Sequence, residues 1–196
     1  MKKRPYKLRK RALDQERTRQ RIVDATIELH GTLGPKNTSI SAVAERAGVQ
    51  RLTVYRHFPN EFALFTACSS HWLSMNPPPN PEDWAGIDDP QERTAAALKA
   101  LCAYYRKTAS MLTLVYRDAD EIEALKGPVQ GFQGYLDAVR DDLVTAWRPD
   151  GRRSQLFSAT IAHAIAFSTW SSLSGMGLSD HQVRRLLLNW ISATIA

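Results

Sequence analysis

The sequence from residue 38 to residue 64 reads TSISAVAERAGVQRLTVYRHFPNEFAL, and this stretch decides the fold. Its spacing predicts one short helix over Ser39–Ala47, a turn at Gly48, and a second short helix over Gln50–His57 that stops before Pro59. Two short helices joined by a tight turn that contains glycine are typical of the helix-turn-helix that reads DNA.

The apolar residues of this stretch recur at helical spacing, so each predicted helix has one side suited to burial. In the first helix they are Ile40, Val43, Ala44 and Ala47, and around the second they are Val49, Val54 and Phe58. The side chains left for the outside can hydrogen-bond to bases, carry charge or contact a thymine methyl group: Gln50, Arg51, Leu52, Thr53, Tyr55 and His57. An ordinary helical hairpin with a solvated face is the alternative interpretation of the pattern alone.

Neighbouring segments extend the pattern. They are RIVDATIELH at residues 21–30, the pair Thr38-Ser39, AERAGV at 44–49 and TVYRHF at 53–58. Over roughly residues 15–70 the chain resembles the N-terminal domain of the TetR family. The resemblance implies an all-helical homodimer that regulates transcription, usually as a repressor that a small molecule releases from DNA.

The chain departs from the family pattern in three places. The serine that usually caps the recognition helix is replaced by Gln50, a poor N-cap, and a glycine is frequent where Leu52 stands. The Ser-Lys-Glu run that usually opens the next helix is Asn60-Glu61-Phe62 in this chain. Asn60 can still cap that helix, whereas Glu61 stands where the family has a lysine that touches phosphate.

The positive charge of the chain is concentrated at its N-terminal end. Residues 1–21 hold ten lysines and arginines against two acids, a net charge of +8 in a chain whose total is +6. We expect residues 1–14 to form a basic arm that neutralises phosphates or enters the minor groove, chiefly through Lys7, Arg9, Lys10 and Arg11. A solvated tail and an organellar presequence are the alternatives, and the arm lacks the apolar segment of a secretory signal.

The sequence shows no pattern of catalytic or metal-binding residues. The two cysteines, Cys68 and Cys102, form neither a metal-binding pair nor a disulfide framework, which fits a reducing, cytoplasmic location. The histidines show no metal-ligand spacing with cysteine, aspartate or glutamate. A nucleophile elbow and a phosphate-binding glycine loop are also missing from the sequence. We therefore expect no cofactor, no metal ion and no enzymatic activity.

Helical periodicity predicts an all-α fold. The resemblance implies an N-terminal three-helix helix-turn-helix DNA-binding domain and a C-terminal helical bundle for ligand binding and dimerisation. We expect the first domain over residues 15–75, including a linking helix at 60–75, and the second over 76–196. Prolines open a linker that reaches about residue 88, and Trp84 within it is expected to pack back onto the body. Further helices are predicted at 15–30, 89–107, 128–147, 153–173 and 179–194, with a broken helical stretch at 110–126.

The segment from Ser154 to Ser179 contains no aspartate, glutamate, lysine or arginine. It is long enough to span a membrane, but serine, threonine, glutamine and histidine recur through it, so we expect no membrane segment. A soluble helix that is apolar all round must be covered all round. We expect a homodimer through the helices at 153–173 and 179–194, which the resemblance also implies. A central helix buried within a monomer is the alternative.

Aromatic residues are frequent after residue 70, and an aromatic cavity inside a helical bundle is a usual site for a small molecule. Taken singly, each is more often an ordinary core residue. The resemblance implies a pocket among the helices over 60–173, and the candidate effector-binding residues are Trp72, Tyr104, Tyr105, Met111, Tyr116, Phe132, Tyr135, His163, Phe167 and Trp170. Few of them are polar, so we expect an apolar or aromatic effector.

The expected function is ligand-responsive regulation of transcription by a homodimer on double-stranded operator DNA. Gln50, Arg51, Leu52 and Thr53 would meet bases, while Thr38, Tyr55, His57 and the arm would hold phosphates, which position the protein without specifying sequence. The alternatives are an effector-independent regulator or an activator of the same fold and, from another class, a helical enzyme that uses the aromatic cavity.

Overall fold

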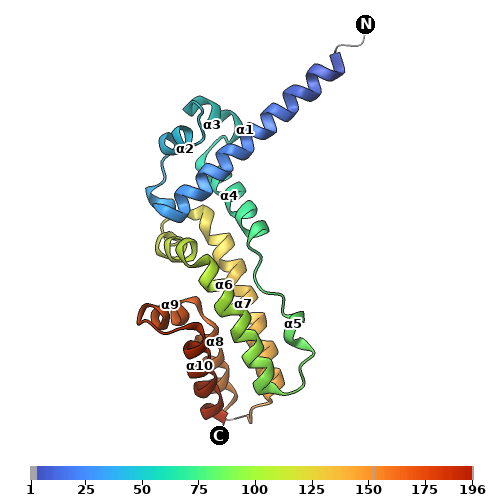
Figure 1. Cartoon of the computed structure of the whole chain (residues 1–196), viewed down its shortest axis with the longest axis vertical. Helices are drawn as coiled ribbons and strands as arrows, with labels where there is room; N and C mark the ends of the chain where they lie inside the picture. Colours follow the sequence, from blue (N-terminus) through green and yellow to red (C-terminus); the bar gives the residue numbers. More distant parts are fainter. Residues whose placement is uncertain (1–3, 152, 196) are drawn as a thin grey trace. The chain divides into compact units, whose positions relative to one another are not determined.

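The computed structural model describes residues 4–151 and 153–195, with side chains from residue 9 onward. All regular secondary structure in these ranges is helical, as Figure 1 shows, which confirms the predicted all-α class. The chain forms two compact units: unit 1 comprises Met1–Asn76 and Ser110–Val129, and unit 2 comprises Pro77–Ala109 and Gln130–Ala196. The chain therefore leaves unit 1, returns to it, and leaves it again.

Unit 1 contains the predicted helix-turn-helix. Its helices are α1 (Arg4–Thr32), the 3-10 turn η1 (Pro35–Asn37), α2 (Ile40–Arg46), α3 (Arg51–His57) and α4 (Glu61–Met75). The core between them is built from the apolar positions expected of α2 and α3, together with residues of α1, α4 and the start of α7 (Glu123–Trp147): Ile22, Val23, Ala25, Ile40, Val43, Ala44, Ala47, Val54, Phe58, Leu64, Phe65 and Ala124. The apolar stripes predicted for the two short helices are confirmed.

Local capping explains where these short helices begin and end. The Ser39 hydroxyl accepts from the Ala42 amide at the start of α2, and the Asn60 side chain accepts from the Ala63 amide at the start of α4. Gly48 turns the chain between α2 and α3 with a φ of +64°, a conformation that glycine adopts without steric strain. Gln50 makes no side-chain cap at α3, as its poor capping tendency predicts.

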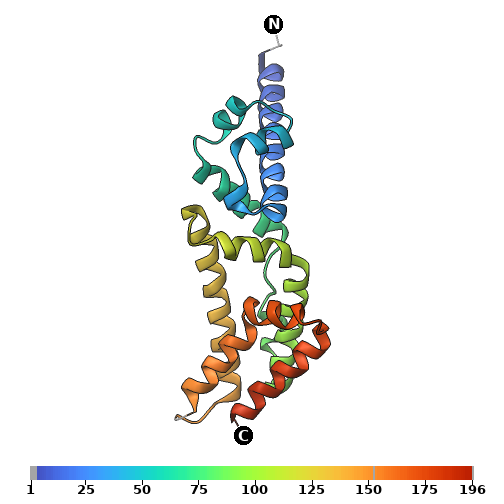
Figure 2. The same cartoon turned by 90° about the vertical axis from the view of Figure 1, so that its left-hand side faces the viewer.

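The prediction that helix 1 begins near residue 15 is wrong, because α1 already begins at Arg4. Much of the basic arm is therefore helical. Its lysine, arginine, leucine and alanine residues are good helix formers, and Pro5 falls in the first turn, where a helix tolerates proline. Figure 2 shows α1 as one straight helix that runs alongside α2 and α3.

Unit 2 holds α5 (Glu82–Ala85), most of α6 (Pro90–Asp118) and α7 (Glu123–Trp147), and then α8 (Ser154–Ile165), α9 (Phe167–Gly175) and α10 (Asp180–Ile195). Trp84 in α5 is 1% exposed, so the expectation that it packs back onto the body is confirmed. A capping box begins α10, since Ser179 and Gln182 exchange backbone-to-side-chain hydrogen bonds.

The predicted break after residue 107 is wrong, because α6 runs without interruption to Asp118. The Thr108 hydroxyl donates to the Tyr104 carbonyl within the same helix, so this polar side chain does not interrupt it. The next helix also begins earlier than predicted, at Glu123, and includes Pro128. No glycine or proline lies within α6 after Pro90, so no residue there stops the helix.

The single helix predicted over 153–173 is divided at Ala166, whose extended backbone (φ −69°, ψ 141°) separates α8 from α9. Two side chains take up carbonyls beside the break. The Tyr105 hydroxyl donates to the Ile165 carbonyl at 2.6 Å, and the Thr169 hydroxyl donates to the His163 carbonyl at 2.7 Å. The break is stable because the carbonyl groups beside it still accept hydrogen bonds.

Candidate nucleic-acid interface

The outer face of α3 presents most of the residues predicted to read DNA. Leu52 is 66% exposed and Tyr55 41% exposed, and Arg51 and Gln50 are also exposed. Thr53 and His57 are half-buried at the edges of this face. Two cationic or hydrogen-bonding side chains and one apolar side chain therefore stand together on the first turn of α3, the part of a recognition helix that contacts base edges.

Buried residues fix the rotation of α3 about its own axis. Val54 is fully buried and Phe58 is 3% exposed, and both belong to the core of unit 1. At the other end of the motif, the Arg46 ε-nitrogen donates to Glu28 of α1 at 2.7 Å, which ties α2 to α1. Turning α3 to hide Arg51 would expose Val54, so burial sets which side chains face outward.

Thr38 does not face solvent as a phosphate-binding residue would. It is 6% exposed, its hydroxyl donates to the Gly34 carbonyl at 2.8 Å, and its amide donates to the Pro35 carbonyl at 3.1 Å. In this conformation Thr38 closes η1, the turn that leads into α2.

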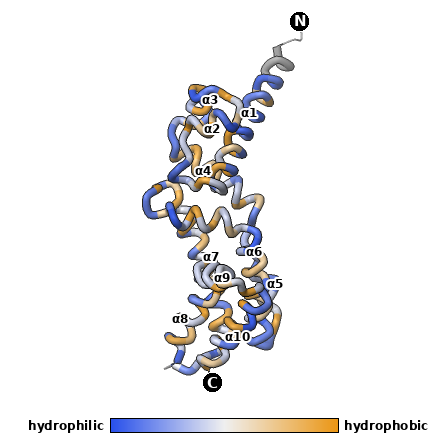
Figure 3. Tube along the Cα trace, turned by 60° about the vertical axis from the view of Figure 1, so that its left-hand side comes forward, coloured by the Kyte–Doolittle hydropathy of each residue, from blue (hydrophilic) through white to orange (hydrophobic). Residues whose placement is uncertain are grey.

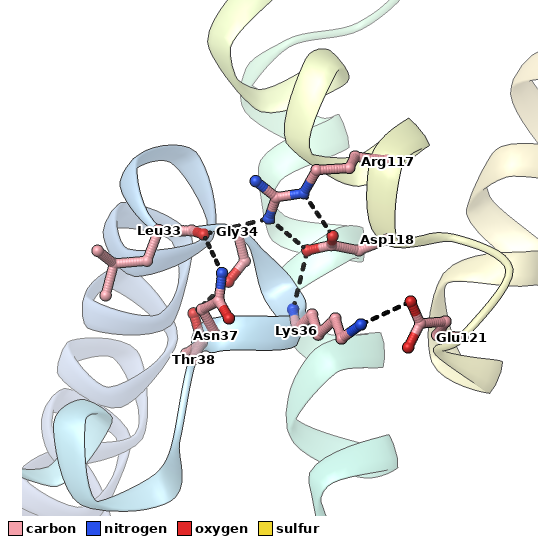
Figure 4. Close-up of polar contacts among 8 residues, drawn as sticks. All are labelled: Leu33, Gly34, Lys36, Asn37, Thr38, Arg117, Asp118 and Glu121. Atoms are coloured by element: carbon pink, nitrogen blue, oxygen red, sulfur yellow. Dashed lines mark hydrogen bonds and ion pairs between the residues drawn. The ribbon is translucent and has the colours of Figure 1, made fainter.

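Asp118, at the end of α6, anchors the same turn (Figure 4). Its carboxylate accepts from the Lys36 amide at 2.9 Å and from the Arg117 guanidinium at 2.7 and 3.0 Å. The side chain of Asp118 is 2% exposed, and its hydrogen bond from Arg117 lowers the pKa of this carboxyl group, so it stays ionised. A buried carboxylate with these partners holds the turn before the helix-turn-helix against the end of α6.

Further contacts in Figure 4 reinforce this anchor. The Lys36 ammonium group pairs with Glu121 at 2.7 Å, and the Arg117 guanidinium also donates to the Leu33 carbonyl at 3.3 Å. Gly34 lies against this cluster with a φ of +91°, and a Cβ atom there would come within 2.8 Å of the Asp118 carboxylate. The close approach therefore requires glycine at this position.

The basic arm belongs to unit 1 and is part of α1. Arg9, Lys10 and Arg11 are exposed, and Lys7 lies in the helix although its side chain is outside the described residues. The Arg19 guanidinium sits 4.8 Å from the centre of the Phe58 ring, a cation–π contact that joins α1 to the end of α3.

Six of the ten candidate effector residues meet in one aromatic cluster inside unit 2. Tyr105 is near its centre, with ring centroids 6.4 Å from Phe132, 5.5 Å from Phe167 and 5.9 Å from Trp170. Phe132 also stacks on Tyr135 at 5.7 Å and approaches Tyr104 at 5.8 Å. The prediction that these residues gather is therefore visible in the packing, and their role in binding a ligand stays a prediction.

Several polar atoms of the aromatic cluster bond to protein atoms. The Tyr105 hydroxyl donates to Ile165, as described above, and the Tyr135 hydroxyl donates to the Pro79 carbonyl at 2.8 Å. The Trp170 indole donates to Asp180 at 3.1 Å. Burial raises the pKa of Tyr135, so its hydroxyl remains protonated at neutral pH.

The other four candidates lie elsewhere. Trp72, Met111 and Tyr116 belong to unit 1, and Met111 is 8% exposed there. His163 lies on α8 in unit 2 and is exposed.

The family model described as bacterial regulatory proteins of the tetR family matches residues 22–68, which include the whole helix-turn-helix. TtgW of Pseudomonas putida, described as an uncharacterized HTH-type transcriptional regulator, is 32% identical over 137 residues. That alignment covers 67% of this chain and 98% of TtgW. The chain belongs to the TetR family.

Other TetR-family comparisons agree. The HTH-type transcriptional regulator SrpR of Pseudomonas putida is 32% identical over 117 residues, which span 58% of this chain and about half of SrpR (53%). Among solved structures, NalD of Pseudomonas aeruginosa, described as the secondary repressor of the MexAB-OprM multidrug efflux pump, has a TM-score of 0.65 at 21% identity. That match covers 93% of this chain and 98% of NalD, and at this identity it shows the fold alone.

The interactions that hold this TetR-family chain's DNA-binding unit were only partly visible in its sequence. Asp118 and Arg117 went unnoticed, because their partners in the turn lie more than 80 residues away. A signal existed in Gly34-Pro35, a pair that marks a tight turn needing tertiary support.

In the described part of the chain, no helix combines the length and the hydropathy of a membrane span.

Proposed function

We propose that this protein is a homodimeric repressor that binds a near-palindromic operator, with one α3 helix in the major groove of each half-site. The observation that supports this most is the outer face of α3. It presents Gln50, Arg51 and Leu52 to solvent while Val54 is fully buried beneath them. A two-fold dimer with such helices reads two half-sites one helical turn apart, or a multiple of that.

The first turn of α3 carries the base contacts in this proposal. Arg51 is suited to the O6 and N7 acceptors of guanine, and Gln50, which does not cap the helix, is free to pair with adenine. Leu52 and the Thr53 methyl group fit a thymine methyl group. Tyr55, His57 and the arm contact phosphates, while Thr38 shapes the turn before α2.

The dimer forms through α8 and α10. Leu156, Ala159 and His163 make an exposed strip along α8 without acidic, lysine or arginine side chains, and Trp190 of α10 is 38% exposed. A groove of about 620 Å³ beside Ser158 and Ala162 gives room for close helix approach. Exposed apolar residues along two neighbouring helices are suited to a second copy of the chain.

The effector in this proposal is a small apolar or aromatic molecule that binds at the aromatic cluster of unit 2. Ring faces and edges there favour aromatic partners. Such a ligand releases the operator only by the difference between its affinities for the DNA-bound and the released conformations. If the protein is instead a regulator without an effector, or an activator, the proposed DNA contacts are the same.

Selection of duplexes from a random library by the purified protein tests the proposal. We expect a near-palindrome to be enriched, and the logarithm of its affinity to fall with the logarithm of salt concentration by about 0.9 per neutralised phosphate. Replacing Arg51 with alanine should relax the choice at one position of each half-site by about 1–3 kcal/mol. Equal binding of selected and random duplexes would contradict the proposal.

Effector binding needs a separate experiment. Small aromatic and aliphatic compounds are added to the protein–operator complex, and release of labelled operator is followed by fluorescence anisotropy. Phe132→Leu, which removes a ring while keeping an apolar side chain, should weaken the response to an active compound at unchanged operator affinity. An active compound whose effect is the same on this variant would place its site elsewhere.

A further inference from the structure

The N-terminal half of α1 is a helix without a core of its own. Residues 9–17 are exposed, and the first fully buried side chain of the described part of α1 is Ile22. Figures 1 and 2 show this part projecting beyond the rest of unit 1, at the end where α2 and α3 lie. Figure 3 shows it to be mostly hydrophilic. A solvated helix of this length is free to contact a partner of unit 1.

The Arg19–Phe58 contact places the base of this projection beside the C-terminal end of α3. A helix rises 1.5 Å per residue, so Arg9 lies about 15 Å further along the axis than Arg19. The same length of duplex holds about four base pairs at 3.4 Å each. A protein whose α3 occupies a half-site therefore carries this helix to the adjoining duplex.

The charges of the projection are unevenly distributed around the helix. Positions three and four residues apart share a face. Among the side chains that the structure describes, one face carries Lys10, Arg11 and Arg17 in the projection and Arg21 just past its base, and we call these four residues the basic row. Asp14 lies within this face. Arg9 and Glu16 point to the other side of the helix, where their charges offset each other. The positive potential is therefore greatest along the basic row.

Helical structure restricts how the projection can meet DNA. A helix with side chains is about 10–12 Å across. The minor groove of B-DNA is about 6 Å wide, so a helix cannot enter it as an extended arm does. The sugar-phosphate backbone remains open to a basic helix, and lysine and arginine are suited to it.

We infer that the N-terminal half of α1 binds, as a rigid helix, the phosphate backbone of the duplex that flanks each half-site. The basic row makes the contacts, and Asp14 weakens them. This inference rests on the proposed operator binding and adds to it a second DNA-contacting surface, the part of the duplex that it touches, and the reason that α1 is long.

The first test removes one negative charge from each side of the helix. Asp14→Asn should raise affinity for the selected operator about two- to fivefold at 50 mM salt, because a carboxylate among phosphate contacts repels the DNA. Glu16→Gln makes the same change of charge two residues away on the other face and should alter affinity less than twofold. Equal effects of the two variants would overturn the assignment of the face.

The second test removes positive charges. Arg11→Gln with Arg17→Gln should lower the salt slope of operator binding by about 1.8, since each lost phosphate contact contributes about 0.9. Its matched control, Lys99→Gln with Lys107→Gln, neutralises two exposed residues of unit 2 and should leave the slope unchanged. Hydroxyl-radical protection of the flanking duplex should disappear in the first variant only.

The third test separates a helix from a flexible charged tail. Ala12→Pro keeps every charge but breaks the exposed helix, because proline removes a backbone hydrogen bond and clashes with the preceding turn. It should shorten the footprint and reduce affinity, while Ala12→Ser changes neither. Full affinity in Ala12→Pro would overturn the rigid-helix inference.

The results also distinguish this inference from the proposed function. Wild-type protein that prefers its selected operator, with unchanged salt slopes in both double variants, would overturn the inference alone. Wild-type protein that does not distinguish selected from random duplex would overturn the operator proposal and, with it, the flanking contact.

Discussion

Gly34 has a backbone conformation that other residues rarely adopt, with φ at +91° and ψ at 156°. We expect Gly34→Ala to lower the free energy of unfolding by about 2–3 kcal/mol, because backbone strain of this kind costs about 1–3 kcal/mol and the new methyl group also meets Asp118 and Arg117. Gly48→Ala is the matched control. Gly48 also has a positive φ, +64°, but no atom lies within 4 Å of the added carbon, so a loss of about 1 kcal/mol is expected. Urea denaturation measures both, and equal losses would contradict this account.

His30 makes the stability of unit 1 sensitive to mild acid. It is 2% exposed beside Cys68 and Phe65, and burial lowers its pKa from 6.5 to about 4. Below pH 6.5 the unfolded chain takes up a proton that the folded chain refuses until about pH 4, so stability falls as the pH falls through this window. We expect a loss of about 2 kcal/mol between pH 7 and pH 5.

Urea denaturation at several pH values checks the His30 prediction. His30→Met should flatten the dependence between pH 7 and pH 5, because no titrating group is then buried at this position. The exposed His181 provides the control, and His181→Gln should keep the dependence of the wild type. An equally steep dependence in His30→Met would assign the acid sensitivity to other groups.

At the scale of helices, the division between α8 and α9 depends on two side chains. Tyr105→Phe removes the donor to the Ile165 carbonyl and leaves that buried acceptor without its hydroxyl partner. We expect a loss of about 1–3 kcal/mol in the free energy of unfolding. Thr169→Val, which removes the donor to the His163 carbonyl at similar side-chain volume, should cause a loss of the same kind. Thermal and urea unfolding measure both, and wild-type stability in the two variants would show that these bonds do not hold the break.

Some helix boundaries can be predicted from the sequence and others cannot. The difference is whether the contacts that set a boundary join residues close together or far apart in the sequence. The helix-turn-helix was predictable because its apolar spacing and its caps at Ser39 and Asn60 are local. The break at Ala166 was not predictable, because the Tyr105 hydroxyl that donates to the Ile165 carbonyl beside it lies 60 residues away in the sequence. Lys36 and Asp118, 82 residues apart, were missed for the same reason.

The residues on the outer face of α3 were predictable for a similar reason. The burial of Val54 and Phe58 follows from their spacing, and it leaves Arg51, Leu52 and Tyr55 outside. The burial of Thr38 was not predictable, because its neighbours give no sign that its hydroxyl closes a turn on Gly34. The length of α1 was underestimated, since clustered charge suggested a tail although most residues of the arm are good helix formers.

At the scale of the whole molecule, the proposed dimer gives a prediction about Leu156. This side chain is 64% exposed on α8, so glutamate at this position should not disturb the fold of one protomer. Buried against a partner, the same carboxylate costs several kcal/mol. We therefore expect Leu156→Glu to be monomeric by light scattering, with unchanged helicity by circular dichroism and with greatly weakened operator binding.

Two other variants control the dimer experiment. Met176→Glu places the same charge on a residue that is 75% exposed in the turn between α9 and α10, and it should remain dimeric. Leu187→Glu should instead unfold the protomer, because Leu187 is 1% exposed within its own unit. A dimeric Leu156→Glu would show that this strip of α8 lies outside the interface.

Unit 1 is discontinuous in sequence, and this has a consequence for its synthesis. When the ribosome has released the first 76 residues, the nascent chain lacks Asp118, which holds the turn before α2, and Ala124, which belongs to the core. The DNA-binding unit is therefore complete only after Val129 has emerged, when α6 has also been made. Domains often fold in the order in which they are translated, but here the N-terminal unit can be completed only after the middle of the chain has been synthesised. A message cut short after residue 76 would yield a fragment without these supports, and such a fragment is a substrate for proteases rather than a competitor for the operator.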